Sequence, residues 1–309
     1  MAAGIPCLVG RQVRPEHRRA EPCPGGPRPP QRPGHRGGGR GGIGRRFPTV
    51  PRNPVDRPRD SLSVAVPLLP DLSSRLETEE WMDDFSIADA RLTRALRDLR
   101  RINRLLGGYR ATDRALDPAL RHHDHLRLLD VGCGSGDHLV HLARRGERFG
   151  CTLDLIGVDA NPVTVGHARA HLDQHLPPRL RNRVRVEIGD AQALSHDAGA
   201  VDIAHAALFL HHFHGPSAVR VLSEMQRVAR HGLLVNDLHR HLLAYVGIWG
   251  LSRALGLAPM VQHDGPVSVR RGFRRADLHT LARGARLPAP TVRWHWAFRW
   301  TLSTLDLDA

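Results

Sequence analysis

Glycines stand at three alternate positions, Gly132, Gly134 and Gly136, after a short apolar run within residues 126–137. A polar stretch typical of a helix follows, so the pattern predicts a buried strand, a tight turn and a helix. Glycine allows the sharp bend and lets a ligand approach the backbone closely. The unpaired N–H groups at a helix N-terminus favour a carboxylate or a phosphate. The turn alone therefore predicts a nucleotide-like ligand.

Asp130 stands two residues before the first glycine, at the predicted carboxyl end of the strand. Ligands of open α/β sheets bind at that edge. The dinucleotide fingerprint G-x-G-x-x-G would need a glycine where the chain has Asp137. A carboxylate repels a pyrophosphate but attracts a cofactor with a cationic amino group and a sulfonium. The spacing therefore disfavours an NAD-dependent oxidoreductase. A turn that only connects strand to helix is the alternative.

Two further acids stand where later strands are predicted to end. Residues 153–158 read as the second strand, and Asp159 follows them. The step from Asp130 to Asp159 has the length of a βαβ unit, and an acid at this place can accept both hydroxyls of a ribose. Residues 184–188 read as the third strand, before Asp190. Either acid can instead have a structural role at its strand end or turn. Together the three acids predict contacts around one nucleoside.

This arrangement resembles the class I S-adenosylmethionine (SAM)-dependent methyltransferases, over about residues 126–235 and more loosely beyond them. The resemblance implies that SAM is the cofactor and that the protein is an enzyme of the transferase class. It also implies that the glycine turn holds the methionine part, the second acid the ribose, and the third acid with the next N–H the adenine. The cofactor residues expected are Asp130, Gly132, Cys133, Gly134, Gly136, Asp159, Ala160, Asp190, Ala191 and Ala206.

Histidines follow the predicted fourth strand, residues 201–210, in the sequence HHFH. Amino methyltransferases of nucleic acids carry an Asn/Asp-Pro-Pro-aromatic turn there, to grip a flipped base. Its absence favours a small apolar or aromatic acceptor, as in the quinone and polyketide branch of secondary metabolism, methylated at O or C. A histidine suits proton removal near neutral pH, so His211 or His212 is the predicted general base. Since the chain has 21 histidines, a purely structural role in the loop is the alternative.

No set of clustered carboxylates and histidines is evident from the spacing, so no metal is expected. The four cysteines likewise lack metal-like or disulfide-framework spacing, and a reducing cytoplasm fits them. The oligomeric state and the identity of the acceptor cannot be read from the sequence.

The predicted fold is α/β: a Rossmann-like, doubly wound, seven-stranded, mostly parallel sheet with an antiparallel edge strand, plus N-terminal helices. Residues 233–235 are expected as the fifth strand, and a sixth is poorly marked, near residues 286–287 or absent. The strong alternation in residues 291–302 predicts a strand, which could complete the sheet in an antiparallel hairpin. The residues expected on one face of that strand are Val292, Trp294, Trp296, Phe298 and Trp300.

Helical periodicity appears before the first strand. Residues 83–106 predict an amphipathic helix, or two short ones, closed by Gly107 and Gly108. A second short helix is expected from Asp117 and Pro118. We therefore expect an N-terminal helical cap at 76–124, before a SAM-binding domain at 125–309.

A substrate lid is expected at about residues 241–272. Residues 241–260 are nearly apolar, but Ser252 and Arg253 would lie near the middle of a bilayer, which disfavours a transmembrane span. Helices that cover the substrate are expected instead, and transient contact with a membrane surface stays open. The polar cluster that follows could hold a carboxylate through Arg270 or Arg271, or be an exposed loop.

The N-terminal residues 1–75 are predicted to be a disordered tail. The formal net charge of the chain is +14, and residues 1–60 alone carry 13 Arg against 4 Asp or Glu, with 12 Pro and 11 Gly. Such a composition does not bury enough apolar surface to fold. A solvated tail, or translation from upstream of a start at Met82, is favoured. The alternative function is a nucleic-acid-binding or RNA-modifying methyltransferase-like protein that uses this basic arm.

Overall fold

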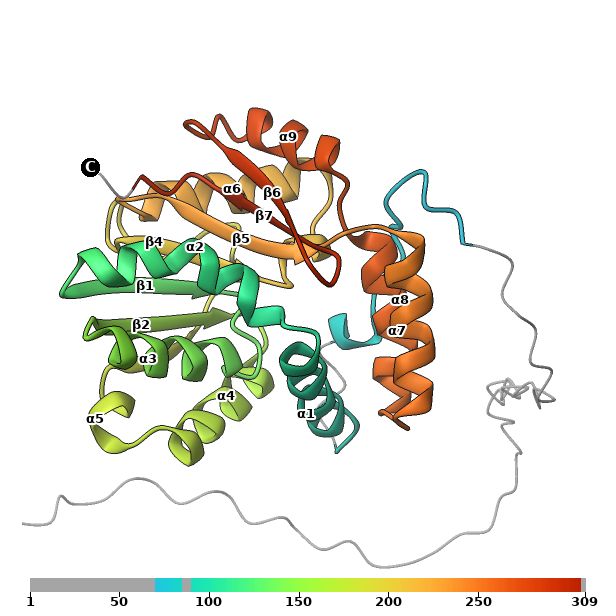
Figure 1. Ribbon diagram of the computed structural model, residues 1–309, viewed down its shortest axis with the longest axis horizontal. Helices are drawn as coiled ribbons and strands as arrows, with labels where there is room; N and C mark the ends of the chain where they lie inside the picture. The colour runs from blue at the N-terminus through green and yellow to red at the C-terminus, as the bar shows by residue number, and fades with distance from the viewer. Residues whose placement is uncertain (1–69, 85–89, 307–309) are drawn as a thin grey trace, which may run out of the picture. The chain divides into compact units, whose positions relative to one another are not determined.

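The computed structural model describes residues 70–84 and 90–306, and these contain one seven-stranded sheet (Figure 1). The strands are β1 (His125–Val131), β2 (Thr152–Asp159), β3 (Val184–Ile188), β4 (Ile203–Ala207), β5 (Leu233–Leu238), β6 (Thr291–His295) and β7 (Arg299–Ser303). Their order across the sheet is β3-β2-β1-β4-β5-β7-β6. The first five are parallel, and β7 runs antiparallel to both of its neighbours. The predicted Rossmann-like fold is confirmed, although β6, not the antiparallel β7, forms the edge.

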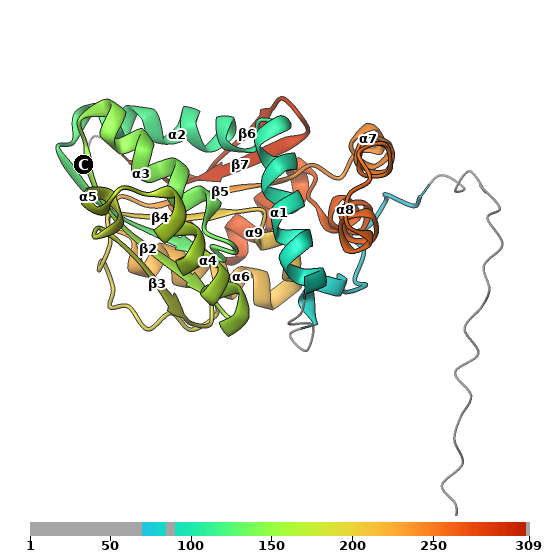
Figure 2. The same ribbon diagram turned by 90° about the horizontal axis from the view of Figure 1, so that it is seen from below.

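Helices cover both faces of the sheet and its carboxyl edge. Their bounds are α1 (Ala90–Leu105), α2 (Gly108–His122), α3 (Asp137–Phe149), α4 (Pro162–His175), α5 (Pro178–Arg181), α6 (Gly215–Val228), α7 (Leu242–Ala254), α8 (Pro259–Arg271) and α9 (Arg275–Gly284). Figure 2 shows α2 and α3 on one side of the sheet and α6 on the other. Alternate residues of the buried strands point to the two faces, so each face has its own apolar core. Helices α1, α7 and α8 lie beyond the strand ends (Figure 1).

The C-terminal alternating segment is a hairpin, and the prediction of a strand running through 291–302 is wrong. Strands β6 and β7 flank a turn at residues 296–298, where Ala297 and Phe298 have φ values of 62° and 56°. Trp294 pairs with Trp300 across the hairpin, while Trp296 lies in the turn. The missing sixth strand is thus the first arm of this hairpin, and none forms at residues 286–287. Alternation predicts extended backbone but gives no signal for a turn that lacks glycine and proline.

The helical predictions fare differently. Helix α2 begins at Gly108 and runs through Pro118, so the prediction that this proline starts a helix is wrong. Of the two readings of the polar cluster, the exposed loop is wrong, because the cluster forms the second half of α8. The amphipathic helix expected within residues 83–106 is present as α1, preceded by a 3-10 helix at Trp81–Asp83, while residues 85–89 lie outside the described part.

The predicted tail lies mostly outside the described residues, but its last part, residues 70–75, is described. The Arg75 guanidinium donates to the carbonyl oxygens of Arg271 and His211, at 2.7 and 2.9 Å, and lies 4.3 Å over the Phe273 ring. The folded core thus includes residues that the sequence assigned to the tail. Among the described helices, none has the length and apolar character needed to cross a bilayer.

Candidate active site

A cavity of about 980 Å³ opens at the carboxyl ends of the strands and is bounded by α1, α7 and α8. It contains most of the predicted cofactor residues. Those that line it are Asp130, Gly132, Cys133, Gly134, Asp159, Ala160, Asp190 and Ala191. Gly136 lies behind the turn, where a Cβ would meet that of Ala168 at 3.4 Å, and Ala206 is fully buried within β4. Ala207 and Leu208 line the cavity beside Ala206.

The glycine turn has the conformation that the sequence predicts. Gly132 has a φ of +70°, and a Cβ there would lie 2.0 Å from Cδ2 of Phe209. Gly134 has a φ of +53°, and a Cβ there would meet no protein atom within 4 Å. The first glycine thus lets the turn pack on the loop after β4. The second leaves the backbone open toward the cavity.

A buried hydrogen-bond chain orients Asp130. Its Oδ1 accepts from His205 Nδ1 at 2.8 Å, and His205 Nε2 lies 3.1 Å from the Thr112 hydroxyl. The amide of Asn236 donates to that hydroxyl at 3.1 Å. A carboxylate only accepts, so Nδ1 carries the proton and Nε2 can accept from Thr112. Among the described residues no hydrogen bond reaches the second oxygen of Asp130, and Asp130 lines the cavity.

Asp159 is tied to the glycine turn. Its Oδ2 accepts from the Gly134 N–H and its Oδ1 from the Asn161 N–H, both at 3.0 Å. Burial raises the pKa of this carboxyl above its ordinary value, against the effect of these bonds. The carboxylate is therefore held rigidly at the end of β2. Asp190 is more exposed, at the rim, and accepts from the Gln192 N–H at 2.8 Å.

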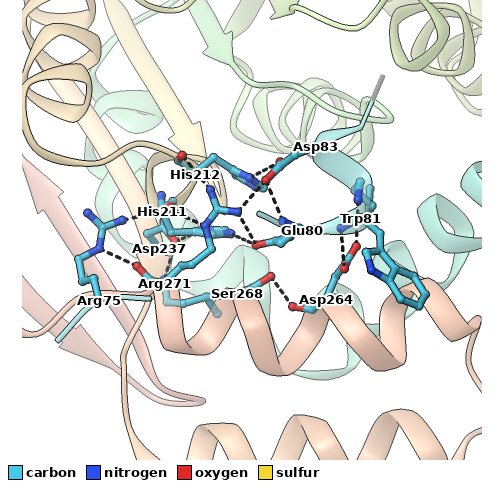
Figure 3. Close-up of polar contacts among 12 residues, drawn as sticks. Arg75, Glu80, Trp81, Asp83, His211, His212, Asp237, Asp264, Ser268 and Arg271 are labelled. Atoms are coloured by element: carbon cyan, nitrogen blue, oxygen red, sulfur yellow. Dashed lines mark hydrogen bonds and ion pairs between the residues drawn. The ribbon is translucent and has the colours of Figure 1, made fainter. Parts of the chain in front are cut away.

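His211 is almost fully buried beneath the cavity and bound to two acids (Figure 3). Its Nδ1 donates to Asp237 Oδ1 at 2.7 Å, and its Nε2 lies 3.4 Å from Glu80 Oε1. Burial alone would lower the pKa of His211, but Asp237 and Glu80 outweigh burial and raise it to about 9. His211 is thus a protonated imidazolium near neutral pH and is poorly suited to accept a proton.

Because of this ion pair, the free energy of unfolding should decrease at alkaline pH. The pKa of His211 rises from 6.5 to about 9 on folding, so the contribution is complete below pH 6.5 and disappears as pH rises through 9. The full loss corresponds to about 3 kcal/mol of unfolding free energy. The pKa of Asp237 is lowered against the effect of burial, chiefly by His211, so this acid titrates below that range.

Urea unfolding, followed by circular dichroism from about pH 6 to about pH 10, measures this loss. His211→Gln should flatten the profile, because glutamine does not titrate. An equal alkaline loss in the variant would contradict the assignment to His211.

His212 has the geometry of an available base. Its Nδ1 donates to Asp83 Oδ1 at 2.8 Å, and about a quarter of its side chain is exposed. Both residues line the cavity, and no hydrogen bond joins His212 Nε2 to another described residue. Asp83 is itself held by Arg271 Nη1 at 2.6 Å. Although burial opposes it, the bonds from His212 and Arg271 keep the pKa of Asp83 below its ordinary value.

The two arginines proposed for substrate binding differ from expectation. The guanidinium of Arg271 donates to Asp83 and to the carbonyl oxygens of His211 and His212, as Figure 3 shows. It therefore fixes the loop after β4 and is not free to hold a substrate. Arg270 is absent from the cavity lining.

Within the described residues, Glu80, His211 and His212 each place one potential ligand atom within 4.8 Å of the others. The expectation that no carboxylate and histidine set gathers is therefore wrong. Arg271 Nη1 lies 3.8 Å from Glu80 Oε1, and the His211 imidazolium faces the same oxygen. These positive charges already neutralise the Glu80 carboxylate and would repel a metal cation at this place. The absence of a metal from the reaction stays a prediction.

Sequence reasoning missed the acids that support the histidines. Asp237 lies at the carboxyl end of β5, as Asp130 and Asp159 lie at the carboxyl ends of β1 and β2, so the same rule would have found it. Glu80 and Asp83 come from the segment before α1, and no local pattern links that segment to the loop after β4. Only the tertiary fold brings them together.

The part of the chain that forms this cavity has relatives among known proteins. Residues 128–232 match a family model described as a methyltransferase domain. A magnesium-protoporphyrin O-methyltransferase of Rhodobacter capsulatus is 30% identical over 127 residues, which are 41% of this chain and 51% of that protein. An indolepyruvate C-methyltransferase of Streptomyces griseus is 36% identical over 86 residues, 28% of this chain and 24% of the other. This chain thus spans about half the length, or less, of these relatives.

A ubiquinone biosynthesis O-methyltransferase of Acinetobacter baylyi is 26% identical over 178 residues, 55% of this chain and 70% of that protein. Among solved structures, a SAM-dependent methyltransferase from Aquifex aeolicus matches with a TM-score of 0.46 and 16% identity. It covers 66% of this chain and 95% of its own.

Proposed function

Because this chain contains a class I SAM-dependent methyltransferase domain, we propose that it methylates an O or C atom of a small apolar or aromatic acceptor. The observation that carries the proposal is one cavity with two ends. The glycine turn and its acids line one end, and the loop after β4, helix α7 and the C-terminal hairpin line the other. Its volume, about 980 Å³, lies at the upper end of the usual range for small-molecule sites.

The cofactor end fits SAM. Asp130 presents a carboxylate for the amino group, Asp159 one for the ribose hydroxyls, and Asp190 with the Ala191 N–H borders the space for the adenine. The open space beside Gly134 leaves room for a ligand against the backbone. When bound, SAM supplies an electrophilic methyl group on a sulfonium. The protein orients the acceptor for in-line attack on that methyl.

The acceptor end is mainly apolar. Leu243 on α7 and Trp294 and Trp296 on the hairpin line the cavity, yet about half or more of each side chain is exposed. Phe209 and Phe213 line it from the loop after β4. Exposed aromatic side chains at a cavity mouth favour a flat, apolar ligand. These contacts support an aromatic acceptor better than a sugar or a phosphate.

Isothermal titration calorimetry of the full chain with S-adenosylhomocysteine tests the proposed function. Saturable binding is expected, and Asp159→Asn should weaken it, because the amide NH2 would face a backbone N–H and only one accepting oxygen would remain. Absence of binding to the native protein would refute the proposal.

We assign the general base to His212, whose Nε2 has no described protein partner. His212→Gln should lower kcat for a phenolic acceptor by about a hundredfold or more, the usual contribution of a positioned base. The assay follows transfer of radiolabelled methyl from SAM to a panel of phenols and catechols. The KM for SAM should stay unchanged.

His122→Gln is the matched control, since His122 is exposed on α2 and does not line the cavity. Loss of activity in both variants, or in neither, would remove His212 from this role. Asp83→Asn should reduce kcat less than His212→Gln, because Asp83 acts only by orienting the ring.

A further inference from the structure

Arg299 is a buried cation without a partner in the cavity wall. It is the first residue of β7, its exposed fraction is 3%, and it lines the cavity. Its Nε and Nη1 have no hydrogen-bond partner within residues 70–84 and 90–306. No carboxylate of these residues forms an ion pair with it at 4.0 Å or less.

Such an arrangement is unfavourable in the protein alone. A buried charge without a counter-ion costs several kcal/mol, and buried guanidinium groups are normally paired. Burial lowers the pKa of Arg299 to about 10, with only Asp237 opposing this effect, so the group stays charged near neutral pH. Asp237 uses its oxygens on His211 and on backbone N–H groups. It does not complete the coordination of Arg299.

The fold places this charge beside the C-terminal hairpin, and its field also reaches His138 in the first turn of α3. Arg299 pairs with Leu238 of β5, and it follows directly on the turn of the C-terminal hairpin. Leu238, Trp294 and Phe298 line the same part of the cavity. One unpaired guanidinium thus lies among apolar and aromatic side chains. The site fits a ligand with a flat apolar body and a single negative charge.

We propose that Arg299 binds a carboxylate of the methyl acceptor, which is therefore an aromatic or apolar acid. The planar fork of a guanidinium matches the two oxygens of a carboxylate. A single unpaired cation favours a monoanion over a phosphate. This inference deepens the proposed function and rests on it. The other carboxylate that could reach Arg299 is that of the cofactor's methionine part.

The binding test uses salicylate and salicylamide, which have the same shape and differ in charge, titrated calorimetrically into the full chain with and without S-adenosylhomocysteine. Native protein should bind salicylate more tightly than salicylamide. Arg299→Met should weaken salicylate binding by about tenfold or more, the usual effect of losing a hydrogen bond to a charged group. Arg293→Met is the control, because Arg293 is exposed on the same hairpin and does not line the cavity.

A second readout needs no ligand. Since the unpaired charge is lost, Arg299→Met should raise the melting temperature by a few degrees. Arg299→Lys, which keeps the charge but not the fork, should retain only part of the preference for salicylate. If the methionine variant does not fold, the lysine variant takes its place in the binding test.

Four outcomes would overturn the inference: no binding of either probe, equal binding of both, equal loss in Arg293→Met, or a lower melting temperature for Arg299→Met. If Arg299→Met weakens the binding of S-adenosylhomocysteine but not of methylthioadenosine, which lacks the carboxylate, then Arg299 binds the carboxylate of the cofactor. That result would also overturn the inference. A native protein that prefers salicylate but does not bind S-adenosylhomocysteine would refute the proposed function, and with it the assignment of this carboxylate to a methyl acceptor, while carboxylate binding at Arg299 would stand.

Discussion

Replacing Asp237 with alanine should lower the free energy of unfolding by about 3–5 kcal/mol, the usual cost of removing one partner of a buried ion pair. Asp237 is 1% exposed and accepts from His211 Nδ1 at 2.7 Å. It also accepts from the backbone N–H groups of His211 and Leu238, at 3.1 and 2.7 Å. Without the Asp237 carboxylate, the buried His211 imidazolium and Arg299 guanidinium would lose a negative charge that stabilises them.

Urea unfolding near neutral pH measures this change, and Asp154→Ala is the matched control. Asp154 also has two basic partners, His125 at 2.8 Å and Arg183 at 3.0 Å, but it is about one third exposed. Exposed ion pairs contribute about 0–1 kcal/mol, so the control should change little. Similar losses of unfolding free energy in the two variants would show that the contribution of the Asp237 ion pair to stability does not come from its burial.

Gly132→Ala should weaken the binding of S-adenosylhomocysteine by at least about a hundredfold. This corresponds to a cost of about 3 kcal/mol for displacing the Phe209 side chain. The added Cβ would lie 2.0 and 2.2 Å from Cδ2 and Cγ of Phe209. Phe209 lines the cavity, so it must move together with the loop that carries His211 and His212. The φ of +70° adds a backbone cost for any residue with a Cβ.

Gly150→Ala is the control for the backbone term. Gly150 has a φ of +75° and closes α3, and a Cβ added there would meet no protein atom within 4 Å. This variant should lose about 1 kcal/mol of stability and bind S-adenosylhomocysteine as the native chain does. Tight binding by Gly132→Ala would mean that Phe209 is not locked against the turn.

The parallel core was predictable because its signals are local. Each buried strand is a short apolar run, and each ligand-facing acid stands directly after one. Parallel strands bring their carboxyl ends to one edge, so Asp130, Asp159 and Asp190 could be assigned to one cavity without knowing the packing.

The acceptor side was predicted less well because its contacts are long-range. The Asp83–His212 and Arg271–Asp83 bonds join residues 129 and 188 positions apart. Nothing in the local sequence indicates which of the many histidines and arginines will meet. The prediction that a helix starts at Pro118 failed for a related reason. Packing of α2 on the sheet overrides the local tendency of proline to interrupt a helix.

The position of β7 in the sheet bears on how the protein is made. Strand β5 pairs on one side with β4, but its other partner, β7, comes more than 60 residues later in the chain. Until residues 299–303 leave the ribosome, the apolar strand β5 presents an open hydrogen-bonding edge, of the kind that promotes aggregation. The sheet is therefore complete, and this edge covered, only after the last arm of the hairpin has been made.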